Sequence, residues 1–144
     1  MSALLDTMDA LEYYRQPLPK TLGKEWFVDQ FLPLLNDKVA NPRDLLSTTT
    51  EHIAHQIAGA VKGHGLDTML VTGGGAKNKY LTARIQALVP GCKITTPPAD
   101  IIDYKEAIIF ALLGFLRLTS QPNCLSSVTG ARCDNCGGDI AGLA

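Results

Sequence analysis

The chain has 144 residues, of which 46% are hydrophobic and 19% charged, and its formal net charge is −1. A chain of this size and composition can bury a core of its own, and it lacks the clustered lysines and arginines that bind nucleic-acid phosphates. The longest apolar run, residues 107–116, is too short to cross a bilayer and the first residues lack a signal-peptide pattern, so we expect a cytoplasmic protein that binds neither nucleic acid nor membrane.

Helical spacing of apolar residues predicts three helices in the first half of the chain, at residues 4–14, 25–35 and 42–61. A segment rich in proline and glycine separates the first two. The third helix has the clearest beginning, with Asn41 as N-cap and Pro42 in the first helical position. Its core-facing side is expected to carry Leu45, Ile53, Ile57 and Val61.

A strand–helix–strand unit follows. Residues 68–72 are predicted to form a buried strand, 78–88 a helix and 92–96 a second strand. The inner face of the helix is expected to carry Leu81, Ile85 and Leu88. Two strands joined by a helix favour a right-handed parallel crossover, so the sequence predicts an α/β fold with helices packed on a small, mainly parallel sheet.

The last predicted helix covers residues 103–118. It is apolar on nearly all sides over 107–116, and such a helix is expected to be buried. The tail from Ser120 has the composition of a loop. No shift in composition marks a boundary, so residues 1–144 are expected to form a single domain.

Three consecutive glycines, Gly73, Gly74 and Gly75, lie between the first predicted strand and the helix after it. Glycine allows positive φ and close approach of a ligand, and the N–H groups at a helix start favour an anion or a polar ring edge. The stretch fits neither a P-loop nor the dinucleotide pattern G-x-G-x-x-G, since Asn78 takes the last position of the latter. A nucleotide or phosphate site and a tight turn without a ligand both remain open.

Histidines and cysteines give weaker signals. His52 and His55 share one helix face, but the H-E-x-x-H order is absent, and a solvated or core-edge pair is favoured over a metal site. Cys133 and Cys136 form a single C-x-x-C in a glycine-rich tail. Thiols without a role are the favoured interpretation, with metal binding and redox chemistry as the alternatives. We therefore assign no metal ligand in this chain.

Four segments, in order, resemble motifs of the anhydro-N-acetylmuramic acid kinases, a family of the actin, hexokinase and heat-shock chaperone superfamily. The nine residues 70–78 resemble the family's adenosine motif G-G-G-A-x-N. The other three are similar to P-K-S-x-G-[KR]-E-x-F, D-x-x-E-A-x-x-F-A and S-V-T-G-A, at residues 19–27, 103–111 and 127–131. Together they extend over most of the chain.

The resemblance implies a fold and a reaction. Family members have two ribonuclease H-like lobes of the actin/hexokinase type, and with MgATP and water they convert 1,6-anhydro-N-acetylmuramic acid to N-acetylmuramic acid 6-phosphate, in peptidoglycan recycling. It also implies that Gly73, Gly74, Gly75 and Asn78 bind adenosine. It places Glu106 and Asp103 on the sugar side of the cleft, whereas helix-start acids that complement the dipole are the alternative.

Two family segments have no counterpart in this sequence: the phosphate loop G-x-M-S-G-T-S-x-D-G, and D-T-G-P-G-N, whose aspartate is the general base. Phosphoryl transfer and general-base catalysis need such groups in place, so no catalytic residue is assigned and the chain alone is expected to be inactive. It is expected to be the C-terminal lobe, with a missing N-terminal lobe as partner and an exposed apolar face that drives self-association. The alternatives are a free-standing nucleotide-binding or regulatory module and a subunit that completes a split kinase.

Overall fold

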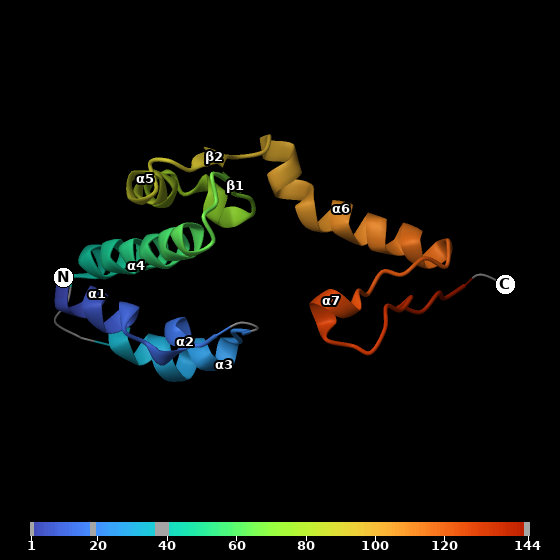
Figure 1. Cartoon of the computed structure of the whole chain (residues 1–144), viewed down its shortest axis with the longest axis horizontal. Coiled ribbons are helices and arrows are strands. Elements are labelled where there is room, and N and C mark those ends of the chain that lie inside the picture. The colour runs from blue at the N-terminus through green and yellow to red at the C-terminus, as the bar shows by residue number, and fades with distance from the viewer. Residues whose placement is uncertain (1, 18–19, 37–40, 143–144) are drawn as a thin grey trace. The chain divides into compact units, whose positions relative to one another are not determined.

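A computed structural model describes residues 2–17, 20–36 and 41–142 of the chain (Figure 1). The chain divides into two compact units, Met1–Thr96 and Pro97–Ala144, which are described separately below. The first unit is an α/β unit in which helices pack on a two-stranded parallel sheet. The second contains a long helix and the tail that folds back on it.

The first unit begins with two short helices, α1 (Ser2–Asp9) and α2 (Glu12–Arg15), so the single helix predicted over residues 4–14 is wrong. The backbone of Leu11 is extended, with φ −54° and ψ 137°, and this breaks the helix. In a continuous helix the side chains of Asp9 and Tyr14 would point about 140° apart. The break lets both side chains reach His52, on another helix.

Residues 24–35 are helical almost as predicted, but in three forms: α3 (Lys24–Trp26), the π-helix η1 (Phe27–Phe31) and the 3₁₀-helix η2 (Leu32–Leu35). Pro33 has no backbone N–H, so it cannot donate the α-helical bond to the carbonyl of Asp29. The change of helical form beside Pro33 follows from that missing donor. Phe31, at the end of the π-helix, is buried.

The long helix α4 (Pro42–Gly63) begins where the sequence predicts, because the side-chain oxygen of Asn41 accepts a hydrogen bond from the backbone N–H of Arg43 at 2.9 Å. Its buried face differs from the prediction. Ile53 is 40% exposed, although α4 packs against both α1 and α5. The buried residues of the helix are Thr48, His52, Ala54, Ala58 and Val61.

The strand–helix–strand prediction is confirmed in order and direction. Strands β1 (Thr68–Leu70) and β2 (Lys93–Thr95) pair in parallel, with Met69 opposite Ile94, and α5 (Lys79–Leu88) lies between them in sequence. The expectation of a buried strand is wrong, since Thr68 and Leu70 are exposed, Leu70 by 65%, and Met69 is only half-buried. Met69 and Ile94 pack on the core, so the described helices of the first unit cover the face of the sheet that carries these two side chains.

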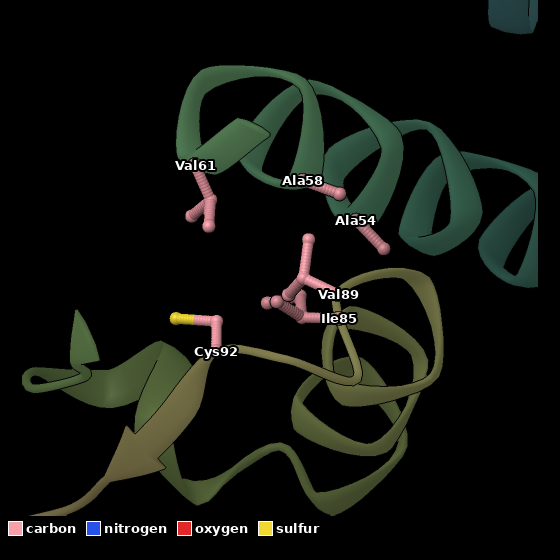
Figure 2. Packing of buried hydrophobic residues seen from close by; sticks show 6 residues of the cluster. All are labelled: Ala54, Ala58, Val61, Ile85, Val89 and Cys92. Atoms are coloured by element: carbon pink, nitrogen blue, oxygen red, sulfur yellow. The ribbon is translucent and has the colours of Figure 1, made fainter. Parts of the chain in front are cut away.

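The core of this unit lies between α4, α5 and the turn before β2. In Figure 2 the α4 side chains face those of α5 and of that turn, and the labelled residues are Ala54, Ala58, Val61, Ile85, Val89 and Cys92. Ile85 is 1% exposed, and Leu81 and Leu88 pack beside it, as the helical spacing predicts. This packing fixes the position of α5, and with it the turn that connects β1 to α5.

In the second unit, α6 (Ala99–Leu118) begins four residues before the predicted start, directly after Pro98, whose carbonyl accepts the first helical bond from Ile102. The expectation that this helix is buried is wrong within the described residues, since Phe110 is 70% exposed and no residue of α6 is buried. The tail is also not all loop: it contains the short helix α7 (Ser126–Thr129) and a bridge between Cys124 and Asn135.

Candidate nucleotide site

The glycine turn begins at Gly73, three residues after the end of β1. Gly73 has φ 77°, a backbone conformation that glycine adopts without steric cost. A single 3₁₀ turn, η3 (Gly74–Lys77), follows, closed by hydrogen bonds from Ala76 N to Gly73 O (3.0 Å) and from Asn78 N to Gly75 O (3.1 Å). The turn therefore has its own internal hydrogen bonds and a defined shape at the carboxyl end of β1.

Gly74 and Gly75 are not required by the packing of the described residues. A Cβ built on either would meet no atom within 4 Å, and neither has a positive φ. Glycine in a helical turn is destabilising compared with alanine, so the fold alone gives no reason for glycine at these two positions. A ligand that approaches the backbone closely does give one. This open surface on a rigid turn is the observation that best supports a binding site.

Asn78 is the N-cap of α5, the helix that follows the turn. Its side-chain oxygen accepts a hydrogen bond from the backbone N–H of Leu81 at 3.1 Å. Among the described residues its side-chain amide donates to no partner, so the NH₂ group is available to a ligand at the turn. Just before the turn, the hydroxyl of Thr72 is buried and without a hydrogen-bond partner in the described part of the chain.

The two acids predicted to face the sugar, Asp103 and Glu106, lie on α6 in the other unit. They are the fifth and eighth residues of that helix, because it begins at Ala99, and the first-turn acid is Asp100 instead. The alternative that they complement the dipole at a helix start is therefore wrong. That these two acids border the sugar, on the same cleft as the glycine turn, stays a prediction.

A buried polar network in the first unit was not predicted. The Nδ1 atom of His52, a residue 1% exposed, lies 2.6 Å from Asp9 Oδ1, and its Nε2 lies 3.0 Å from the hydroxyl of Tyr14. A carboxylate can only accept, so Nδ1 carries the proton and Nε2 accepts from Tyr14. Asp9 also accepts hydrogen bonds from His55 (2.8 Å) and Gln56 (2.9 Å).

This network decides between the two favoured interpretations of the histidine pair, because it places the pair at the edge of the core. His52 is not solvated, and both imidazoles use Nδ1 to donate to one carboxylate. The signal in the sequence is a pair of histidines among the apolar residues of a helix, but the partner is more than 40 positions away along the chain. Spacing alone could not identify Asp9 as that partner.

Two carboxylates in this region have lowered pKa values. Burial alone would raise the pKa of Asp9, but hydrogen bonds from His55, His52 and Gln56 together lower it below its usual value. The pKa of Glu51 is lowered chiefly by the guanidinium of Arg84, which donates two hydrogen bonds of 2.7 Å to its two oxygens. The ion pair between Glu51 and Arg84 joins α4 to α5, and the hydrogen bonds to Asp9 join α1 to α4.

We expect stability to fall in acid for this reason. A carboxylate whose pKa is lower in the folded state stabilises the fold fully above its unfolded pKa, and this stabilisation disappears as the pH falls through the folded value. The free energy of unfolding should therefore decrease below about pH 4. Urea titrations between pH 7 and pH 3 measure it. Asp9→Asn should flatten the dependence, and an unchanged slope in that variant would contradict the assignment to Asp9.

Comparison with known proteins decides the family. The family model described as anhydro-N-acetylmuramic acid kinase matches residues 1–141. The chain belongs to this family. A relative from Streptomyces coelicolor, named "Anhydro-N-acetylmuramic acid kinase", is 40% identical over 124 residues, a match that covers 83% of this chain and 32% of the relative. The chain thus spans about a third of the length of that kinase.

Membership of the anhydro-N-acetylmuramic acid kinase family confirms the resemblance drawn from the four motifs. The structure shows what three of them form: a strand end with a glycine turn, part of α6, and α7 with the residues after it. Among the described residues no helix is long and apolar enough to cross a membrane, and no cluster of three or more His, Cys, Asp or Glu side chains suits a metal ion.

Proposed function

We propose that this chain supplies the adenosine-binding part of an ATP-dependent kinase that opens and phosphorylates 1,6-anhydro-N-acetylmuramic acid. The open backbone of Gly74 and Gly75, on a turn closed by its own hydrogen bonds, is the observation that carries the proposal. The match to the kinase family supports ATP as the ligand. The free NH₂ of Asn78 would donate to an acceptor on the purine or ribose.

The intact kinase would have the ribonuclease H-like architecture and use Mg²⁺ with ATP. The parallel sheet with helices on one face agrees with half of such a lobe. Asp103 and Glu106 would border the sugar on α6. The γ-phosphate needs a phosphate loop, and the attacking water needs a general base; the sequence contains neither family motif. The chain alone is therefore expected to bind nucleotide without transferring phosphate.

The bare apolar surface of α6 favours a second candidate function, that of a subunit completing a split kinase. Phe110 and Phe115 are 70% and 58% exposed, and a helix with such a surface suits burial against another part of a protein. Mixing this chain with an N-terminal lobe of a family member and assaying for sugar phosphate tests this function. Transfer that needs both parts would support it, and no transfer by the mixture would exclude it.

Substitution at Gly75 tests the nucleotide site. The change Gly75→Val places a branched side chain where the ligand would lie, while the open space around this position leaves the fold intact. We expect affinity for ATP and ADP to fall at least about tenfold, equal to about 1.4 kcal/mol of binding free energy. Isothermal titration calorimetry measures it on the full 144-residue chain.

The matched control is Gly91→Val, since Gly91 is also a loop glycine with open space and no positive φ. It lies before the first residue of β2, whereas the glycine turn lies after the last residue of β1. It should leave nucleotide affinity unchanged. Equal affinities in the Gly75 variant and the unchanged chain would contradict the proposed site, as would the absence of binding at millimolar nucleotide.

A further inference from the structure

The first unit also contains a hollow, and no residue of the glycine turn is among the described residues that line it. It has a volume of about 440 Å³ and is lined by residues of α2, by Gln16 and Lys20, and by residues in the last third of α4 and its C-cap. This volume lies in the range of small-molecule sites, roughly 300–1,000 Å³. The residues that line it include Tyr13, Tyr14, Lys20, Gln56, Gly59 and His64. No carboxylate is among the described residues that line it.

Lys20 gives this hollow its charge. The side chain is half-buried, and its Nζ donates to the carbonyls of Tyr13 (3.0 Å) and Tyr14 (3.3 Å) and lies 4.7 Å from the centre of the Tyr13 ring. Within the described part of the chain no carboxylate pairs with it. An ammonium group has three donors, so one remains for a ligand. Since the described residues give the ammonium group of Lys20 no counter-ion, an external anion can supply one.

Gly59 indicates that the space is kept open. It is the eighteenth of 22 residues of α4, in the helix interior, where glycine is destabilising compared with alanine. A Cβ at this position would meet no atom within 4 Å, so packing among the described residues does not require glycine. A side chain here would narrow the hollow opposite Lys20. Glycine at position 59 is therefore explained by an occupant of the hollow.

The polar wall of the hollow is held in place by the buried network. The hydroxyl of Tyr14 is bonded to His52, and the amide of Gln56 donates to Asp9, which in turn holds His52. Tyr14 and Gln56 are thus fixed before any ligand arrives. The hydroxyl of Tyr13 and the ring of His64 make no hydrogen bond among the described residues and can bond to a ligand. A fixed wall with free polar groups suits a polar ligand.

We propose that this hollow binds a small polar molecule bearing an oxyanion, a phosphate ester or a carboxylate of the size of a sugar. Lys20 neutralises the charge, the free groups of Tyr13 and His64 bond to the remaining oxygens, and Gly59 leaves room for the body of the ligand. The site is separate from the proposed nucleotide site and does not depend on it.

Titration of the full chain with inorganic phosphate and, separately, with acetate tests the site by two-dimensional NMR of the backbone amides. We expect saturable shifts at Tyr13, Lys20 and Gly59. Lys20→Gln should lower the affinity for the anion at least about fivefold. Lys24→Gln, on α3 and outside the hollow, should leave that affinity unchanged. Tighter binding of phosphate assigns phosphate esters as the ligand class, and tighter binding of acetate assigns carboxylates.

A second variant guards against loss of the cap that Lys20 provides to α2. Gly59→Leu fills the hollow from a helix position that favours leucine over glycine. The chain should therefore fold but no longer bind the anion. Gly75→Val should leave anion binding unchanged, which separates this site from the nucleotide site. Shifts that do not saturate, or an affinity in the Lys20→Gln and Gly59→Leu variants equal to that of the unchanged chain, would overturn the proposal.

Discussion

Replacing His52 with alanine is expected to lower the free energy of unfolding by about 3 kcal/mol. The imidazole is 1% exposed and joins α1, α2 and α4 through Asp9 and Tyr14. Alanine would leave both partners without the imidazole and create a cavity beside Phe31, whose ring centre lies 5.5 Å from that of His52. Buried groups that lose their partner cost more than the net value of the bond they made.

The control for this prediction is His64→Ala, which removes the same side chain from an exposed position where the ring makes no hydrogen bond among the described residues. We expect a change of no more than about 0.5 kcal/mol there. Urea denaturation followed by circular dichroism measures both variants. A loss of less than 1 kcal/mol for His52→Ala would show that the network contributes little to holding α1 and α2 on α4.

The second large effect concerns α6, whose exposed apolar side chains are expected to make the chain self-associate. Phe110 and Phe115 are the largest of these, and each buried phenylalanine side chain contributes roughly 1.5–3 kcal/mol. Phe110→Glu combined with Phe115→Glu should convert the associated chain to a monomer, because neither glutamate can be buried without a partner. Light scattering at concentrations from micromolar to millimolar measures the mass.

Leu46→Glu is the matched control, since Leu46 is a single apolar side chain on α4 with the same 70% exposure as Phe110. It should leave the mass distribution unchanged, because an isolated exposed leucine is ordinary in monomeric proteins. A chain that stays monomeric at high concentration would contradict the role of α6, and so would association that persists in the double glutamate variant.

Local signals predicted the elements that carry the proposed nucleotide site. Asn41 and Asn78 cap the helices that follow them, because an asparagine oxygen accepts from an N–H only two or three residues away. Two five-residue segments typical of strands, one on either side of a helix, predicted the parallel strand pair. These features depend on neighbours in the chain, so the sequence alone contains them.

Contacts between residues far apart in the sequence account for the differences between the predicted and the observed structure. The break after Asp9 places two side chains on His52, and no local pattern indicates a partner that lies 43 positions away. The burial of α6 was predicted from its apolar composition, but composition shows only that a helix suits burial, not that the covering surface lies within the described residues. Lys20 and Gly59 became visible as parts of one hollow only when the fold brought α2 to α4.

The glycine turn has a different status, because the structure confirms its position between β1 and α5, while adenosine as its ligand, which the family resemblance implies, stays a prediction. Sequence and structure agree that Gly73 needs its positive φ, and the structure adds that Gly74 and Gly75 face open space. That openness separates a binding surface from a turn packed against its own chain. It does not depend on the family match, so the two lines of support are independent.

The binding of ADP to the isotope-labelled chain, followed by NMR of the backbone amides, tests most directly whether this turn holds adenosine. Saturable shifts should centre on Gly74, Gly75 and Asn78 and should also occur with adenosine alone, since the base and ribose make the contacts. Shifts that centre elsewhere, or that occur with inorganic phosphate but not with adenosine, would contradict a purine nucleoside at this turn.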